Sequence, residues 1–388
     1  VVLALSPHPP MGSVACGQGQ NDIVFCRESS GSISHLGTTC AISQIPARKD
    51  EDRYSVGIWS KKEKIVKPLV KDSGQSDEDI LCVGIYDGHG GKDVANLLQS
   101  SLLDEIFTKV SQHEEDSKKK ATAGVPDDCI IEAYRAMDAI AQKSIRSCGS
   151  CALNIFVSNH LNGSKLVQCA WVGDSRVAYF RGSRLKERGD LSRDHNLYLK
   201  EEKDRVVKYG RENGGAVVAR RRNQENEAIG PWAVFTDDPS VHNLSLMMTR
   251  SIGDAMHSKA VISDPEIKSF VVGPEERVRL IMASDGMWRV FDNKLTRKLM
   301  KKIKSPSMAA NRLCLESLWR TQRHTYMKLD DVTVGVVDIV GSRYNSPAAS
   351  EAQMRDSPVR SPVCSPVRSD GPTNDTNDSN DSNDSTPN

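Results

Sequence analysis

The sequence predicts one large domain built from both helices and strands, with an unstructured segment at each end. From about residue 38 to residue 340, short runs rich in Val, Ile and aromatic residues alternate with stretches in which apolar residues recur at helical spacing. The flanking segments are polar and show neither periodicity. We therefore expect a disordered N-terminal arm (1–37), a folded domain (38–341) and a disordered tail rich in Ser-Pro pairs and in Asn, Asp and Ser (342–388).

The strands are predicted from apolar, β-branched runs, several of which end in Asp or Gly. These runs cover 80–87, 152–159, 166–174, 176–182, 279–285 and 332–340. Apolar residues three and four positions apart predict the helices. The helical stretches cover 91–112, 127–147, 199–210 and 306–322. The polar segment 211–243 has few core signals, and we expect an exposed loop or flap there.

Composition excludes several classes of protein. The chain has 52 basic and 51 acidic residues, so its charge gives no general attraction to nucleic acid or membrane. No stretch approaches 18 consecutive apolar residues, so no transmembrane segment is expected. Ten cysteines without a repeated C-x-x-C pair favour free thiols in a reducing compartment. We expect a monomer inside the cell, in the cytoplasm, the nucleus or both.

The sequence pattern at each end of the chain can be interpreted in two ways. A chain that began at Met11 would read MGSVACG, which resembles a myristoylation signal with Cys16 in place of the usual Ser or Thr. We favour a disordered arm, whereas acylation of Gly12 and Cys16 would add a membrane-associated fraction. The tail is too polar to fold on its own. Its Ser-Pro pairs either accept proline-directed phosphorylation or simply belong to a flexible tail: Ser357, Ser361 and Ser365.

The stretch CVGIYDGHGG combines a strand end with reactive side chains. An apolar run delivers Asp87 to the end of a predicted strand, and the glycines allow the backbone to approach a ligand closely. The carbonyl of Gly88 can coordinate a hard cation, and His89 can exchange a proton near neutral pH. On its own, an Asp-Gly turn after a strand is common and indicates only a turn.

Acidic residues recur at or beside other predicted strand ends. They come from distant parts of the chain: Glu51, Asp52, Asp174, Asp254, Asp285, Asp330 and Asp331. If these carboxylates converge, their repulsion requires cations or large pKa shifts. Because oxygen ligands select hard ions, Mg²⁺ or Mn²⁺ fits better than zinc or copper.

An ordered set of motifs resembles the metal-dependent protein phosphatases of the protein phosphatase 2C type. The motifs are EDRYSV, YDGHGG, CGSCAL, WVGDSRVAYF, LSRDHN, MMTRSIGD, SDPEI, ASDGMW and DDVTVGVV. The resemblance implies an α+β fold in four layers, an α-β-β-α sandwich whose two central antiparallel sheets are flanked by helices. It also implies hydrolysis of phosphoserine and phosphothreonine in phosphoprotein substrates, by a water that two Mg²⁺ or Mn²⁺ ions activate and without a phosphoenzyme.

The resemblance assigns metal ligands to the acidic positions. Asp87 matches a carboxylate that bridges both ions, and Gly88 matches a ligand through its carbonyl. One ion would be bound by Asp285 and Asp330. The adjacent residues Glu51 and Asp52 match acidic groups that lie near the other ion and act on it partly through water.

Two catalytic roles follow from the same resemblance. His89 would be the general acid that protonates the departing serine or threonine oxygen. An arginine upstream of the acidic pair would clamp the phosphate, and Arg48 is the candidate, one residue closer to the pair than is usual.

Some positions depart from the family pattern. In the family, two aspartates often help to bind a third ion. Asp174 matches the first of them, but the second position, four residues after Asp285, is occupied by Arg289, which weakens the case for a third ion. Its guanidinium would repel the ion, partly replace its charge or pair with Asp174. Asp331 replaces a common asparagine, and we expect it to be solvated rather than to tighten metal binding.

Other charged residues in the motifs have structural explanations. We expect Asp254 to hold a turn beside the site and Arg176 to join a structural ion pair. The run Arg220–Arg222 is expected to be a solvated face, with phosphopeptide binding as the alternative.

Two rival functions stay open. A pseudophosphatase would keep the fold and bind phosphoproteins without cleaving them, and only Arg289 and the displaced Arg48 favour it. A metal hydrolase of small phosphate esters is the other alternative. The presence of Asp87, Asp285 and Asp330 favours an active protein phosphatase.

Overall fold

The computed structural model describes most of the expected domain. The described residues are 27–28, 33–35, 37–47, 49–68, 76–117, 124–223, 225–236, 245–257, 260–324 and 328–344. They all belong to one compact unit, 1–346, while the second unit, 347–388, lies outside them, as do Gly12, Cys16 and the Ser-Pro sites.

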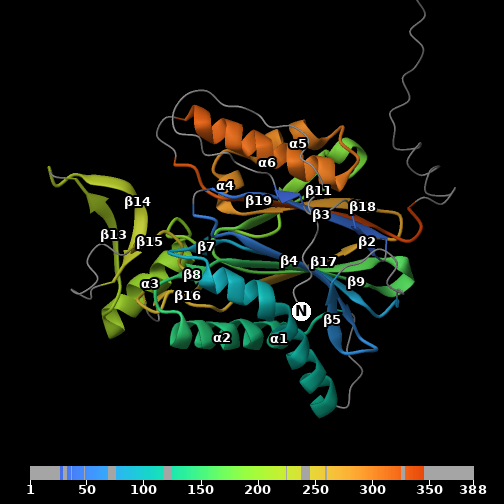
Figure 1. The fold of residues 1–388 in the computed structure, drawn as a ribbon, viewed down its shortest axis with the longest axis horizontal. Coiled ribbons are helices and arrows are strands. Elements are labelled where there is room, and N and C mark those ends of the chain that lie inside the picture. The colour runs from blue at the N-terminus through green and yellow to red at the C-terminus, as the bar shows by residue number, and fades with distance from the viewer. Residues whose placement is uncertain are drawn as a thin grey trace, which may run out of the picture. The chain divides into compact units, whose positions relative to one another are not determined.

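Two antiparallel sheets lie face to face at the centre of the domain (Figure 1). The first runs in the order β1 (Arg27–Glu28), β3 (Thr38–Ile45), β19 (Val332–Val340), β18 (Arg277–Ala283), β11 (Arg176–Arg181) and β12 (Glu187–Asp190), with β2 (Ile33–His35) also on β3. The second runs in the order β17 (Glu266–Val272), β10 (Lys165–Val172), β9 (Ala152–Asn159), β6 (Ile80–Tyr86), β4 (Arg53–Ser60) and β5 (Ile65–Pro68).

Helices cover the outer faces of both sheets (Figure 1). The second sheet is covered by α1 (Asp93–Ser117) and α2 (Asp127–Ser144). The first is covered by α4 (Asp285–Trp288), α5 (Asn293–Met300) and α6 (Pro306–Arg323). The predicted α-β-β-α sandwich is therefore confirmed, and α4 and α5 are additions to the predicted helices.

The central strands are apolar throughout because both of their faces are buried. On β6, one set of alternate side chains lies between the sheets: Leu81, Val83 and Ile85. The other set packs against α1 and α2: Ile80, Cys82 and Tyr86. Burying each such aliphatic side chain is worth about 1.5–3 kcal/mol, so this packing fixes where the strand ends. The described cysteines are all free and buried, as the composition predicts.

Most of the described part of segment 211–243, expected to be an exposed loop or flap, forms a hairpin. It contains β13 (Val217–Arg222) and β14 (Ala228–Phe235), which pair with each other and then with β15 (Ser245–Leu246). This small sheet packs on α3 (Lys200–Asn213) and extends to one side of the sandwich (Figure 1). The arginines of β13 are exposed at its tip, as expected of a solvated charge run.

Three strands of two residues each form a short sheet beside the sandwich. Its strands are β7 (Gly88–His89), β8 (Gly149–Ser150) and β16 (Ile252–Gly253), with β8 in the middle. Two short 3₁₀ turns complete the elements, at Leu161–Gly163 and Ser183–Leu185.

The ends of the domain differ in detail from the expected limits. The strands β1 and β2 pair with β3, although they lie in the segment expected to be a disordered arm. At the other end, the backbone amide of Ser342 donates to the carbonyl of Gly163, and that of Arg343 donates to Pro274.

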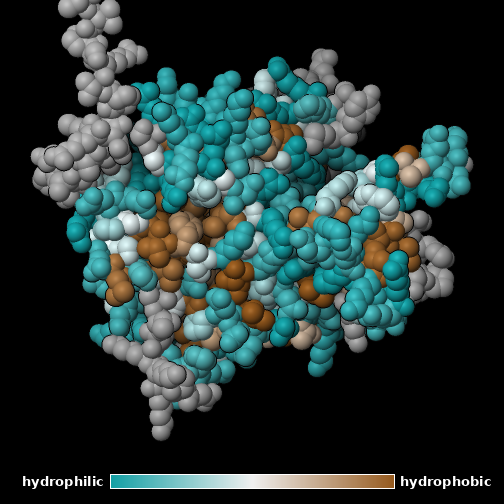
Figure 2. Space-filling model, turned by 180° about the vertical axis from the view of Figure 1, so that it is seen from behind, coloured by the Kyte–Doolittle hydropathy of each residue, from teal (hydrophilic) through white to brown (hydrophobic). Residues whose placement is uncertain are grey.

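The surface of the domain mixes apolar and hydrophilic side chains. On the face drawn in Figure 2, apolar side chains gather in several patches separated by hydrophilic ones. No helix within the described ranges is long and apolar enough to cross a membrane.

A buried glutamate joins α3 to the strand that leads into the short sheet. Glu202 is 2% exposed and accepts hydrogen bonds from Thr249 Oγ1 (2.6 Å), Arg250 Nη2 (2.6 Å) and Arg205 Nη2 (2.8 Å). Burial raises the pKa of Glu202, but the hydrogen bonds from Arg250 and Arg205 outweigh it and lower the pKa to about 2. These hydrogen bonds between α3 and residues 249–250 therefore depend on the charged form of Glu202.

We expect Glu202→Gln to destabilise the protein at neutral pH by about 3 kcal/mol, because it leaves two guanidinium groups short of their carboxylate. Since the folded pKa is below the usual value of 4.5, this contribution is present above about pH 4.5 and is lost as the pH falls towards 2. The difference between the two proteins should therefore shrink in acid, as measured by urea unfolding at each pH. Exposed Glu201→Gln is the matched control, and a difference that did not change with pH would contradict the account.

Candidate metal centre

The ends of several strands bring the predicted acidic residues to one end of the sandwich. Asp87 directly follows β6, Asp285 follows β18 by one residue, and Asp330 lies just before β19. Because β18 and β19 are antiparallel neighbours, the end of one lies beside the start of the other. Across the two sheets, the backbone amide of Asp285 lies 3.3 Å from Asp87 Oδ2 and donates to it.

Burial and neighbouring negative charges shift the pKa values of several carboxylates at this end of the sandwich. Burial raises the pKa of Asp87 well above its usual range, and the carboxylates of Asp52 and Asp285 add to the rise. Burial, with the help of Asp174, raises the pKa of Asp285 to about 8. Burial, with the help of Asp331, raises the pKa of Asp52 to about 7. These upward shifts come first from burial and then from the neighbouring carboxylates, and a cation bound among these groups would favour their charged forms.

Asp331 holds the loop that carries Glu51 and Asp52. It is 4% exposed, and its carboxylate accepts hydrogen bonds from the backbone amides of Glu51 (2.5 Å), Asp52 (2.9 Å) and Ala47. The expectation that Asp331 would be solvated is therefore wrong. The reason is that three amides of an irregular loop need acceptors when they are buried, and a carboxylate supplies two oxygens in one place.

The two acidic residues of that loop face different surroundings. Asp52 is 1% exposed, and its Oδ2 accepts from Thr333 Oγ1 at 2.7 Å. Glu51 is 9% exposed, and its Oε2 lies 3.4 Å from Nζ of Lys49. Gly88 passes so close that a Cβ there would lie 2.6 Å from the carbonyl oxygen of Glu51, so only glycine fits.

His89 and Asp254 form a pair on the short sheet β7–β8–β16. Nε2 of His89 lies 2.7 Å from Oδ2 of Asp254. Between them, a Cβ on Gly149 would come within 2.6 Å of the imidazole, so glycine is required there as well. Burial lowers the pKa of His89, but the Asp254 carboxylate outweighs it and the net shift is upward. Nδ1 of His89 is buried and has no hydrogen-bond partner among the described residues.

Asp174 lies beside the other carboxylates in a half-buried position after β10. Its Oδ1 is 3.4 Å from Sγ of Cys151. Burial raises the pKa of Asp174, and the carboxylate of Asp194 adds to the rise. Asp194 itself pairs with Arg176 at 2.7 Å, which is the structural ion pair expected for Arg176.

Arg289 pairs with two of the expected metal ligands. Its Nη2 lies 2.5 Å from Oδ2 of Asp285 and 2.7 Å from Oδ2 of Asp330. The sequence left open a pairing of Arg289 with Asp174, and Arg289 pairs with Asp285 and Asp330 instead. Arg48, the expected phosphate clamp, lies outside the described residues.

The donor set at this end of the sandwich fits a hard divalent cation. Asp87, Asp285 and Asp330 offer only oxygen, which Mg²⁺ and Mn²⁺ prefer. As the side chains stand, no three His, Cys, Asp or Glu side chains in the described part of the chain are grouped so that they could hold a metal ion. Asp285 and Asp330 face Arg289 instead, so a shared ion requires the guanidinium to move away.

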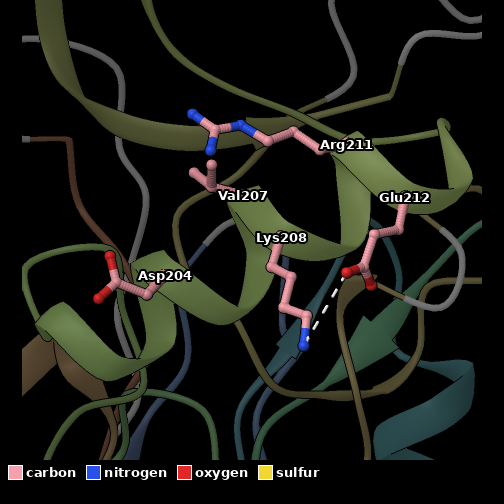
Figure 3. A pocket seen from close by; sticks show the side chains of 5 residues that line it. All are labelled: Asp204, Val207, Lys208, Arg211 and Glu212. Carbon is pink, nitrogen blue, oxygen red and sulfur yellow. Dashed lines mark ion pairs between the residues drawn. The ribbon is translucent and has the colours of Figure 1, made fainter.

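A hollow of about 490 Å³ elsewhere on the surface is not a competing site. It lies along α3, and its lining comes from one helix (Figure 3). Lys208 and Glu212 point toward each other there and lie 3.9 Å apart. No convergent carboxylates or buried nucleophile line it: the lining residues are Asp204, Val207, Lys208, Arg211 and Glu212.

Sequence reasoning missed the role of Asp254 beside His89. We expected Asp254 to hold a turn, and it does accept a hydrogen bond from Ser251 Oγ at 2.5 Å. Its contact with His89 depends on the pairing of three two-residue strands, for which the sequence carries no periodic signal.

Comparisons with known proteins find similar sequences. A family model described as "Protein phosphatase 2C" matches residues 59–325. The chain is 29% identical over 252 residues to a probable protein phosphatase 2C 69 of Arabidopsis thaliana, covering 64% of this chain and 60% of that protein. It is also 29% identical over 289 residues to a probable protein phosphatase 2C 7 of Oryza sativa subsp. japonica, covering 73% of this chain and 64% of that protein. The matches thus span less than two thirds of each relative.

Solved structures show the same fold. A serine-threonine phosphatase 2C from Toxoplasma gondii superimposes with a TM-score of 0.59 at 17% identity, covering 81% of this chain and 98% of that chain. A sex determining protein of C. elegans gives a TM-score of 0.54 at 17% identity, covering 80% of this chain and 66% of that chain. At this identity the similarity establishes the fold alone.

We expect Asp331→Ala to destabilise the protein by about 3 kcal/mol or more, because each buried amide left without an acceptor costs about 1–3 kcal/mol. Asp331→Asn should cost less, since its amide oxygen still accepts from part of the loop. Urea unfolding of the three proteins measures the difference. If the alanine variant were as stable as the wild type, the loop would not depend on this carboxylate.

Proposed function

Because the chain belongs to the protein phosphatase 2C family, we propose that it is a protein serine/threonine phosphatase that hydrolyses phosphoserine and phosphothreonine with the help of two Mg²⁺ or Mn²⁺ ions. The observation that supports the proposal is that distant segments bring the amide of Asp285 to Asp87 and bring Asp285 and Asp330 to one guanidinium. Burial and neighbouring carboxylates raise the pKa of Asp87 and of Asp285, which is common among functional acidic groups.

The metal ligands are assigned by position and donor chemistry. Asp87 is central, because both the amide of Asp285 and the repulsion from the other carboxylates reach it. Asp285 and Asp330 would hold one ion, and Glu51, Asp52 and the carbonyl of Gly88 would serve the other. When bound, the ions would supply an activated water and neutralise the charge of the phosphoryl group.

His89 is proposed as the group that gives a proton to the departing alkoxide. Burial lowers the pKa of the ring, but Asp254, which contacts Nε2, outweighs it and raises the pKa, which favours the protonated form. Nδ1 is buried without a partner in the described part of the chain and is the nitrogen left free for a substrate oxygen. Asp254 thus acts as a positioning residue.

The proposal is tested by measuring phosphate release from a phosphothreonine peptide with Mn²⁺ and with EDTA. We expect release that depends on Mn²⁺ and is abolished by the chelator. Binding of the peptide without release would indicate a pseudophosphatase instead. Rapid hydrolysis of small aryl phosphates with no action on the peptide would indicate a hydrolase of small esters.

We expect Asp87→Asn and Asp285→Asn each to lower the rate of phosphate release by at least about 100-fold, because each removes a charged ligand from an ion that must stabilise the transition state. Circular dichroism should show that both variants stay folded. Exposed Asp128→Asn on α2 is the matched control and should be unaffected. Near-normal rates in either ligand variant would show that the metal assignment is wrong.

We expect His89→Ala to slow hydrolysis of phosphothreonine peptides by about 10²–10⁴-fold, because the poor alkoxide leaving group needs a proton. Hydrolysis of an activated aryl phosphate should be slowed much less, since its leaving group departs without protonation. The ratio of the two rates is the measurement. Equal slowing of both substrates would count against the general-acid role.

A further inference from the structure

We propose that Arg289 is a tethered competitor of the divalent ion, which holds Asp285 and Asp330 when no ion is bound and must release them before an ion can bind. The inference rests on the proposed function, because it concerns the same carboxylates. It goes beyond that function by giving the chain's own residue control over how tightly the metal binds.

The position of Arg289 is set by a short, well-packed helix. Arg289 caps α4 four residues after Asp285, which is the spacing that places two side chains on the same helix face. The preceding residue, Trp288, is 7% exposed, and its Nε1 lies 3.0 Å from the carbonyl of Arg176. The base of the arginine side chain therefore starts from a fixed point beside Asp285.

The guanidinium contacts one oxygen of each of the two carboxylates. Nε and Nη2 of Arg289 lie 2.9 Å and 2.5 Å from Oδ2 of Asp285. The same Nη2 lies 2.7 Å from Oδ2 of Asp330, whose Oδ1 accepts from the amide of Asp331 at 3.1 Å. These charge-assisted hydrogen bonds hold Oδ2 of both carboxylates on a cationic group, which therefore competes with a metal ion for the same two oxygens.

The charge balance favours the guanidinium whenever the ion is absent. Asp285 is repelled by Asp174 and Asp330, and Arg289 is the group that opposes this repulsion. A positive charge fixed to the chain thus takes over part of the neutralisation that an ion would provide. Its pairing stabilises the metal-free protein and makes metal binding an exchange of one cation for another.

The exchange is open to the side chain. Arg289 is 33% exposed and Asp330 is 42% exposed, so the guanidinium lies at the edge of the site and not inside it. A long, flexible arginine stem can swing from this edge into water without unpacking the core. The site therefore has two states. In one, the guanidinium is bound to both carboxylates. In the other, the guanidinium is released and the ion is bound.

The test uses the full chain and two readouts that do not depend on turnover. Binding of Mn²⁺ is followed by the electron paramagnetic resonance signal of the free ion, and stability is followed by urea unfolding with EDTA or with saturating Mn²⁺. The variants are Arg289→Gln, Arg289→Lys and the control Arg312→Gln. Arg312 is a matched control because it pairs with Glu316 at the same four-residue spacing, on α6 and outside the carboxylate cluster.

We expect Arg289→Gln to bind Mn²⁺ about tenfold more tightly or better, and to be less stable than the wild type in EDTA but not in saturating Mn²⁺. Arg289→Lys keeps a competing charge and should stay closer to the wild type, and Arg312→Gln should leave Mn²⁺ affinity unchanged. If the wild type binds Mn²⁺ and Arg289→Gln binds it equally or less tightly, this inference alone is overturned. Absence of Mn²⁺ binding in every variant would overturn the proposed function together with it.

Discussion

Negative charge gathered at one end of the sandwich is the constraint to which the surrounding structure responds. The burial of β6 on both faces delivers Asp87 to that end, and the pairing of β18 with β19 brings Asp285 and Asp330 to it. Burial raises the pKa of Asp87 and of Asp285, and neighbouring carboxylates add to both rises, so the site carries repulsion unless cations balance it. The proposed chemistry uses this imbalance, because ions bound there would both relieve the repulsion and act on a phosphoryl group.

The neighbouring residues balance the charge in three different ways. Backbone amides of an irregular loop surround Asp331, so that its charge organises the loop and is satisfied by hydrogen bonds. An imidazole faces Asp254, which links a structural carboxylate to the proposed proton donor. A guanidinium holds Asp285 and Asp330. Only the last of these can leave without unfolding its surroundings, because Arg289 lies at the surface edge, and this is why metal exchange is assigned to it.

Much of this arrangement could be predicted from the sequence, for definable reasons. The buried strands were found because an apolar run such as 332–340 ends sharply, and the acidic residues were found because they stand at those ends. An exposed loop or flap was expected where the hairpin β13–β14 lies, because its residues are largely exposed and its sequence, broken by Arg220–Arg222 and by Gly230 and Pro231, shows no clear alternation. The burial of Asp331 and the contact between Asp254 and His89 could not be predicted, because both depend on partners more than 160 residues away in the chain.

The most direct test of the metal centre is anomalous diffraction from crystals soaked in Mn²⁺. The account predicts two manganese peaks beside Asp87, with oxygens of Asp285 and Asp330 around one of them and the guanidinium of Arg289 turned away. An empty site at saturating Mn²⁺, or manganese bound away from Asp87, Asp285 and Asp330, would contradict the central claim that these carboxylates converge to hold metal.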